Sequence, residues 1–352
     1  MNISDQQIGD GNAVYITFEA GPTHDGFSSA KSLVKHASDA GADAVKFQIF
    51  NPDRLIRDKN MLYTYDVLSG ESRTATKQIS EPLYDILKRR CMSEQEWKSL
   101  KGYADKLGIS FFATVSDNDD IELASQIGCH SIKIASADIN HIPLLKSAAK
   151  TGLVVQIDTG NATLGEIEKA YDIICDVGNP NIIIHNCPSG YPARLESINL
   201  RMIPTLKQMF NVPIAYSDHT PGHEMDIAAI ALGANMVEKT ITHDRYTKSV
   251  EHIMSLEPSE MKHFVKTIRD VEIALGNTRR YMSEKEQRDR LNIRRSVILH
   301  RDIPKGKKID FSDVTYQRPG YGISPEEFER LVGKTVRRNL KSGDILDFGD
   351  LK

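Results

Sequence analysis

Four residues that can do acid–base or metal chemistry stand together at Ser217-Asp218-His219-Thr220. They follow a short apolar run at residues 212–215 and precede a helix-like segment that starts near Glu224. A buried strand would therefore end here. A histidine in such a place is either a hydrogen-bonded structural residue or a metal ligand or acid–base group at the mouth of a barrel. The motif alone leaves both interpretations open.

Two lysines lie inside predicted strands, where charged side chains are uncommon. Lys46 belongs to Lys46-Phe47-Gln48, and Lys133 opens Lys133-Ile134-Ala135-Ser136. An unpaired ammonium in a dry interior is costly, so each lysine needs an anionic partner. For Lys46 that partner is either an internal carboxylate, such as Glu19 or Asp43, or an anionic substrate. The second interpretation, a phosphate or carboxylate cradle, is favoured by the hydroxyls expected nearby, those of Thr114, Ser136 and Ser217.

Short β-rich runs alternate with helix-like segments over about 260 residues, a pattern typical of a (β/α)₈ TIM barrel. A doubly wound open sheet is the alternative, but no GxGxxG motif follows the first run. In a barrel the chemistry belongs at the C-terminal strand ends. The predicted strands are residues 14–19, 44–50, 110–114, 131–135, 153–158, 181–186, 213–217 and 236–240.

The composition is that of an ordinary globular protein. The chain has 352 residues, of which 40% are apolar and 26% charged, and a net charge of -3. This charge gives no reason to expect nucleic acid or an anionic membrane as a partner. Its four cysteines form no CxxC pair, and we find neither a signal peptide nor an apolar run of membrane-spanning length. A soluble cytoplasmic protein is expected.

Three further segments set the domain organisation. Residues 51–80 form a long connection after the second predicted strand, which we interpret as a lid over the site. The barrel is expected to span residues 1–277 and to be followed by an exposed, charge-rich linker at 278–295. Residues 296–352 contain short β-like runs divided by turns, which indicates a small β-rich domain. The runs are residues 296–300, 314–316, 335–337 and 345–347.

Several motifs occur in an order that resembles a known family. They are Phe18-Glu19-Ala20-Gly21 with His24-Asp25-Gly26, then Gly41-Ala42-Asp43-Ala44-Val45-Lys46-Phe47-Gln48, Lys133-Ile134-Ala135-Ser136, Tyr216 to Thr220, Ser255-Leu256-Glu257-Pro258 and Arg318-Pro319-Gly320-Tyr321-Gly322. Over nearly its whole length the chain is similar to the sialic acid synthases. These enzymes condense phosphoenolpyruvate with an N-acyl hexosamine-type aldose and carry a C-terminal antifreeze-like (SAF) domain.

The resemblance implies roles for individual residues. It implies catalytic roles for Glu19, Lys46, Lys133 and His219. Phosphoenolpyruvate contacts are implied at Lys46, Thr114, Lys133, Ser136, Asn186, Ser189 and Ser217. Sugar contacts are implied at Gln48, Tyr191, Glu251 and Arg318. Arg318 matches an arginine that reaches the partner subunit's sugar site, so a domain-swapped homodimer is expected.

The metal site implied by the resemblance departs from the family pattern. His219 matches the first histidine that holds a divalent cation, Mn²⁺ or Mg²⁺, but Thr240 stands where the second is expected, and a hydroxyl is a poor replacement for imidazole. Either the metal is bound more weakly, or another group takes this place, the candidates being His243, Glu251, His252 and Glu19. We expect the pair Glu251 and His252. Asp158 stands where the family has a serine beside the anionic substrate, so its carboxylate must be protonated, metal-bound or paired with lysine.

The function implied by the resemblance is the synthesis of a nonulosonic acid with release of phosphate by C–O cleavage. The acceptor stays open among the sugars that lead to N-acetylneuraminate, legionaminate, pseudaminate or a less common product. Two other classes remain alternatives. One is a synthase of the deoxy-octulosonate phosphate class on the same barrel, against which the tail domain argues. The other is a non-catalytic sugar-binding relative that has lost its metal.

Overall fold

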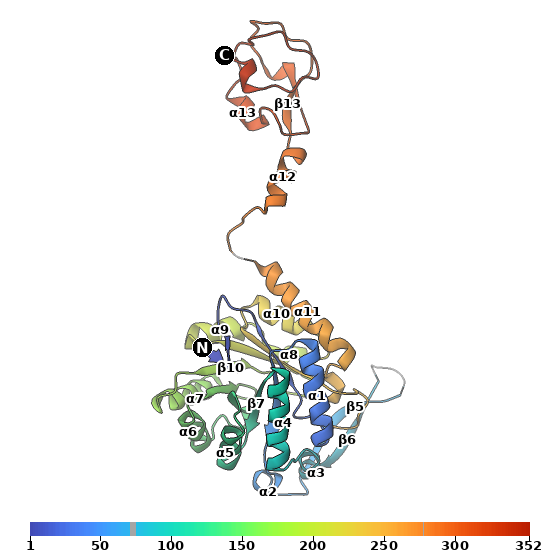
Figure 1. Ribbon diagram of the computed structural model, residues 1–352, viewed down its shortest axis with the longest axis vertical. Helices are drawn as coiled ribbons and strands as arrows, with labels where there is room; N and C mark the ends of the chain where they lie inside the picture. The colour runs from blue at the N-terminus through green and yellow to red at the C-terminus, as the bar shows by residue number, and fades with distance from the viewer. Residues whose placement is uncertain (71–74, 277) are drawn as a thin grey trace. The chain divides into compact units, whose positions relative to one another are not determined.

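The computed structural model describes residues 1–70, 75–276 and 278–352 (Figure 1). It divides into two compact units, Met1–Gly276 and Asn277–Lys352. Each unit is described by itself below.

The first unit is a closed parallel barrel, which confirms the predicted TIM-barrel fold. Its strands follow one another around the barrel in chain order, and the last pairs with the first, Met236 beside Tyr15 and Thr240 beside Glu19. Each predicted strand coincides with an observed one to within a residue at either end. The strands are β3 (Tyr15–Glu19), β4 (Ala44–Ile49), β7 (Ser110–Val115), β8 (Ser131–Ile134), β9 (Val154–Asp158), β10 (Ile182–Asn186), β11 (Ile214–Asp218) and β12 (Met236–Thr240).

Helices cover the outside of the barrel and bury an apolar stripe against it (Figure 1). Local sequence signals start and end them. Ser93, Asp117 and Thr163 form capping boxes, and Gly41 ends the first helix in a left-handed conformation with φ 84°. The principal helices are α1 (Phe27–Ala40), α4 (Glu94–Leu107), α5 (Asn118–Gln126), α6 (Ile142–Lys150), α7 (Leu164–Asp176), α9 (Met202–Phe210), α10 (Glu224–Ala231) and α11 (Pro258–Leu275).

The barrel interior is layered, because alternate residues of each strand face the lumen. The layer at the N-terminal strand ends is apolar and packs on Ile3 and Ile8, which belong to the segment containing β1 (Asn2–Ile3) and β2 (Gln6–Gln7). This layer contains Tyr15, Ala44, Phe112, Val154, Ile183, Ala215 and Met236. Two residues further along the same strands the side chains are polar. The sequence therefore places a polar layer at the C-terminal half of a closed lumen.

The long connection after β4 contains an ordered hairpin, β5 (Leu62–Leu68) with β6 (Thr76–Pro82), between α2 (Pro52–Leu55) and α3 (Leu83–Lys88). Tyr65 and Val67 of this hairpin pack with Ile86 and Val250. The predicted lid therefore has its own secondary structure and rests on the segment that follows β12. Residues Ser72-Arg73-Thr74 of the predicted lid lie outside the described part.

The second unit contains a small core around Val297, Ile309, Phe328 and Val336. Its strands β13 (Ser296–Leu299) and β14 (Val314–Gln317) are antiparallel, whereas the β-like runs expected at 335–337 and 345–347 form single bridges. The unit also contains α13 (Pro325–Glu329), and α12 (Glu284–Ile293) lies within the segment that we expected to be a linker. Across the described residues of both units, the helices are all too short or too polar to cross a membrane.

Candidate active site

Lys133 lies at the centre of the polar layer. Its side chain is completely buried, and its Nζ contacts Glu238 Oε1 at 2.8 Å, Asp158 Oδ1 at 3.0 Å and Ser217 Oγ at 3.0 Å. These partners come from β12, β9 and β11, so the barrel brings Lys133 together with residues up to 105 positions away in the sequence. The ammonium is already fully ion-paired before any substrate binds.

Lys46 joins the same network from β4. Its Nζ lies 2.5 Å from Glu19 Oε2 and 2.7 Å from Glu238 Oε1, so Glu238 bridges both lysines. An internal carboxylate as the partner of Lys46, which the sequence analysis favoured less than an anionic substrate, is thus confirmed for Glu19. It is wrong for Asp43, which instead pairs with Arg269 at 2.7 Å because it lies at the opposite end of the strand.

Gly21 keeps Glu19 in place. The Gly21 amide donates a hydrogen bond to Glu19 Oε1 at 2.5 Å. A Cβ atom on Gly21 would lie 2.6 Å from Gln48 Cγ and 2.9 Å from the Gln48 backbone nitrogen. A side chain at this position would therefore displace the strand that carries both Lys46 and Gln48.

The network carries a net charge of −1, from two lysines and the carboxylates of Glu19, Glu238 and Asp158. Burial opposes the charged forms, but Asp158 and Glu238 raise the pKa of Lys133, and Lys133 together with His185 keeps the pKa of Asp158 low. Asp158 is therefore ionised and paired with lysine. Of the three states allowed by the sequence, the structure supports the ion pair.

His185 and Gln156 extend the network and were missed by the sequence analysis. His185 Nδ1 lies 2.9 Å from Ser217 Oγ, and its Nε2 lies 2.8 Å from Gln156 Oε1. A signal for both exists, because each is the polar residue in an otherwise apolar run and His185 pairs with Asp158 across β9 and β10. These hydrogen bonds fix the orientation of the Ser217 hydroxyl beside Lys133.

The pH dependence of stability should reflect His185. Burial, with a contribution from Lys133, lowers its pKa from 6.5 to about 3. The unfolded state therefore binds a proton between these two pH values and the folded state does not, so stability falls as pH decreases from 6.5 towards 3. This effect amounts to about 1.4 kcal/mol per pH unit for one group.

We expect His185→Gln to flatten the fall of the melting temperature between pH 6.5 and 4, measured by differential scanning calorimetry. Replacing the exposed His141 with glutamine is the matched control and should keep the wild-type slope. An unchanged slope in His185→Gln would show that this histidine is protonated in the folded protein.

His219 lies at the rim rather than in the ion-pair network. Its Nδ1 is 3.0 Å from the Pro188 carbonyl, so this nitrogen carries the proton and Nε2 has the lone pair. The Tyr191 ring lies against it, with centroids 4.5 Å apart. The structure thus brings together His219 and Tyr191, two of the predicted site residues.

The predicted metal ligands do not assemble into a metal-binding group. The part of the chain that the structure describes contains no cluster of three His, Cys, Asp or Glu side chains that could hold a metal ion. His252 Nδ1 instead binds Thr242 Oγ1 at 2.7 Å, and Glu251 is held in a left-handed conformation with φ 71°. The set His219, Glu251 and His252 therefore does not fit a resident divalent cation in this arrangement.

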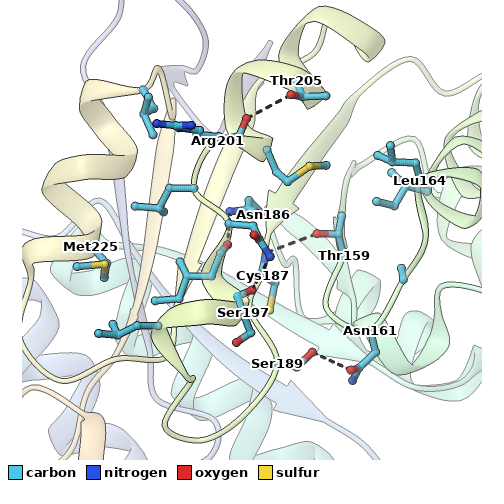
Figure 2. A pocket seen from close by; sticks show the side chains of 18 residues that line it. Thr159, Asn161, Leu164, Asn186, Cys187, Ser189, Ser197, Arg201, Thr205 and Met225 are labelled. Carbon is cyan, nitrogen blue, oxygen red and sulfur yellow. Dashed lines mark hydrogen bonds between the residues drawn. The ribbon is translucent and has the colours of Figure 1, made fainter.

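Two residues predicted to contact phosphoenolpyruvate lie in a neighbouring cavity of about 950 Å³, shown in Figure 2. Ser189 Oγ binds Asn161 Oδ1 at 2.8 Å, and Asn186 Nδ2 binds the Ile198 carbonyl at 3.3 Å. Because both side chains are engaged there, the structure does not bring them to the lysines. The rest of the cavity wall is largely apolar and includes Leu164, Leu195, Leu200, Met202 and Met225.

The remaining predicted residues surround the lumen or belong to the second unit. Thr114 is the register partner of both Gln48 and Lys133 on the adjacent strands. A Cβ atom on Gly160 would lie only 3.2 Å from Ser136 Oγ. The glycine therefore allows the two loops to approach closely. Arg318 is exposed in the second unit and lines a cavity of about 370 Å³ there.

Comparison with known proteins identifies the family. The NeuB family matches residues 33–280, and the SAF domain matches residues 294–352. The chain is 36% identical to the N,N'-diacetyllegionaminic acid synthase of Legionella pneumophila, with 94% of this chain and 93% of that protein covered. It is 30% identical to the human N-acetylneuraminate-9-phosphate synthase, covering 96% of this chain and 93% of the relative.

A solved structure agrees with these relatives. The N-acetylneuraminic acid (sialic acid) synthetase of Leptospira borgpetersenii, in complex with citrate, superposes with a TM-score of 0.71 at 33% identity. The match covers 82% of this chain and 94% of that one. The resemblance seen in the sequence is confirmed over both units. The chain belongs to the NeuB family and ends in a SAF domain.

Proposed function

We propose that the protein condenses phosphoenolpyruvate with an N-acyl hexosamine-type aldose to form a nonulosonic acid and inorganic phosphate. The observation that carries this proposal is the pair of buried lysines, Lys46 and Lys133, which lie in the polar half of the lumen with Ser217. Names of the relatives, which include legionaminic, pseudaminic and N-acetylneuraminate-9-phosphate synthases, support the same reaction class.

The proposed reaction forms one C–C bond and breaks one C–O bond. C3 of phosphoenolpyruvate attacks the aldehyde carbon of the open-chain sugar, water adds at C2, and phosphate leaves with the bridging oxygen. Lys133 and Lys46 would bind the anionic groups of phosphoenolpyruvate, and the hydroxyls of Ser217 and Thr114 would orient them. Glu19, held by the Gly21 amide, is the candidate for proton transfer or for binding sugar hydroxyls.

The divalent metal implied by the family has no step in this proposal, because the expected ligands do not assemble into a cation site. Electrostatic stabilisation is assigned to the lysines alone. Isothermal titration calorimetry with Mn²⁺, carried out on the purified protein with and without phosphoenolpyruvate, tests whether substrate creates a metal site that this arrangement does not contain.

A screen of aldoses tests the proposal. The protein is incubated with phosphoenolpyruvate and a panel of N-acyl hexosamines, with the non-acylated sugars as matched controls, and the released phosphate and sugar acid are measured. We expect phosphate release only with some N-acyl aldoses and in a one-to-one ratio with the product. Consumption of phosphoenolpyruvate in the absence of an aldose would contradict the proposal. So would the absence of consumption with every aldose of the panel.

We also propose that Arg318 acts on the sugar site of a partner subunit. Mixing Lys133→Ala with Arg318→Ala protein tests this, because only a mixed dimer would combine an intact barrel with an intact partner arginine. We expect two inactive preparations to regain about a quarter of wild-type turnover after subunit exchange. If Arg318 served its own subunit, the mixture would stay inactive.

A further inference from the structure

A second polar cavity lies outside the lysine network, at the start of α1. Its volume is about 590 Å³, and it is built from three segments that are distant in sequence: residues 23–32, 89–90 and 243–252. Neither lumen lysine lines it. The lining is rich in hydrogen-bond donors and cations and consists of Thr23, His24, Asp25, Ser28, Ser29, Ser32, Arg89, Arg90, His243, Thr247, Lys248, Ser249 and His252.

Arg90 is a buried cation in this wall that forms no ion pair with a described residue. Only 5% of the residue is exposed. Among the described residues its guanidinium has one hydrogen bond, a long one of 3.4 Å to Ser249 Oγ, and no ion pair, although a guanidinium has five N–H donors. Burial lowers the pKa of Arg90 to about 10, against the opposing effect of Glu251. Such a group is costly unless an anion neutralises it.

His24 provides an unsatisfied donor in the same wall. It is 3% exposed, and its Nδ1 accepts a hydrogen bond from the Gly26 amide at 3.3 Å, so the proton is on Nε2. That Nε2 has no partner in the described chain. One cavity is therefore lined by a neutral N–H donor without an acceptor and by a buried guanidinium with a single long hydrogen bond.

The N-terminus of α1 opens on this cavity. The helix has 14 residues, and its first turn contains no acidic residue. Its N-cap is Gly26, at which an added Cβ would meet no atom within 4 Å, so the space in front of the helix start is open. The free amides at a helix start and the helix dipole both favour an anion. Ser28 and Ser29, in the first turn, add two hydroxyls to the wall.

We propose that this cavity is a binding site for a phosphate-class dianion, held by Arg90, the His24 Nε2–H and the α1 N-terminus. The charges that line the cavity favour this chemistry, because the lining contains three cations and one carboxylate. The cations are Arg89, Arg90 and Lys248, and the carboxylate is that of Asp25. Arg89 is already engaged with Glu81 through two bonds of 2.8 Å, so Arg90 and Lys248 provide the available charge. The same chemistry fits free inorganic phosphate and a phosphate group carried by the sugar.

Thermal unfolding of the full chain with and without inorganic phosphate tests the site without any turnover. Phosphate should raise the melting temperature of the wild type, because a ligand that binds only the folded state stabilises it. Arg90→Gln should reduce this increase by the part that comes from this cavity, while melting at or above the wild-type temperature without phosphate, since it removes a buried charge. The exposed Arg288 gives the matched control, and Arg288→Gln should keep the full increase.

Two further variants complete the test. Ser28→Asp places a carboxylate in the first turn of α1, so it should stabilise the free protein and also reduce the phosphate effect. Lys133→Ala removes a lumen cation that is assigned to the substrate anion, so phosphate should still stabilise this variant through the cavity, and Arg90→Gln added to it should abolish the effect. A phosphate effect that disappears in Lys133→Ala alone, or that Arg90→Gln does not change in the Lys133→Ala background, would overturn the inference by placing the anion elsewhere.

The source of the phosphate is decided by kinetics, and this step rests on the proposed function. The KM values of Arg90→Gln and of the wild type are measured with N-acetylmannosamine and with its 6-phosphate as acceptor. If the site holds a sugar phosphate, KM should rise about tenfold or more for the phosphorylated acceptor alone. If it holds free phosphate, both KM values should stay unchanged. Failure of the proposed function would leave the thermal test intact.

Discussion

Replacing Lys133 with alanine should reduce turnover by about 10³-fold or more, because it removes the charge that we propose binds the anionic substrate in the lumen. Lys133 is completely buried and contacts Asp158, Ser217 and Glu238. Without it, Asp158 would have no cation within hydrogen-bonding distance in the described chain. The variant should therefore also be less stable than the wild type, because an uncompensated buried carboxylate remains.

A control with an equally buried lysine separates the loss of stability from the loss of chemistry. Lys239 is the neighbouring residue on β12, is 1% exposed and pairs with Asp218, but points away from the lumen. Lys239→Ala should lower the melting temperature and keep most of the turnover of the folded fraction. Turnover of Lys133→Ala close to that of Lys239→Ala, in the phosphate-release assay, would contradict the assigned role.

Replacing Asp158 with serine should strengthen the binding of phosphoenolpyruvate and lower its KM by about tenfold, or ~1.4 kcal/mol. Asp158 Oδ1 lies 3.0 Å from Lys133 Nζ and 3.2 Å from Ser217 Oγ. Its carboxylate thus occupies two of the donors that are assigned to the substrate anion. The substitution also changes the net charge of the network from −1 to zero, so an incoming anion meets less repulsion.

Asp158→Asn tests whether charge or space is responsible for this effect. Asparagine has nearly the shape of aspartate, so a lower KM in both variants would identify charge as the cause. Lys133 remains paired with Glu238 in both, which should preserve the fold. A KM that rises in both variants would show that Asp158 assists substrate binding, and the competition proposed here would be wrong.

The fold could be predicted from the sequence because its signals are local. Apolar runs such as Ile182-Ile183-Ile184 and the glycines that end helices, such as Gly41 and Gly108, mark most of the β/α repeats. The lysines of the lumen were recognisable for the same reason, since a charge inside an apolar strand is unusual. The pairing of Lys46 with Glu19 needed only adjacent strands.

The details of the site were harder to predict because they depend on contacts across the barrel. Glu238 reaches Lys46 and Lys133 from β12, at separations of 192 and 105 residues. The expected metal ligands do not assemble because His252 is hydrogen-bonded to Thr242 and the backbone at Glu251 is left-handed. The spacing of residues in the sequence reveals neither feature. Arg90 carried no sequence signal, since its cavity is assembled from three distant segments.

The central claim is a condensation that releases phosphate by C–O cleavage, and an isotope experiment tests it most directly. The protein is supplied with an accepted N-acyl aldose and phosphoenolpyruvate labelled with ¹⁸O at the bridging oxygen, and the products are examined by ³¹P NMR and mass spectrometry. We expect the label to appear in inorganic phosphate and the sugar acid to be unlabelled. Label retained in the sugar acid, or phosphate release without a new C–C bond, would contradict it.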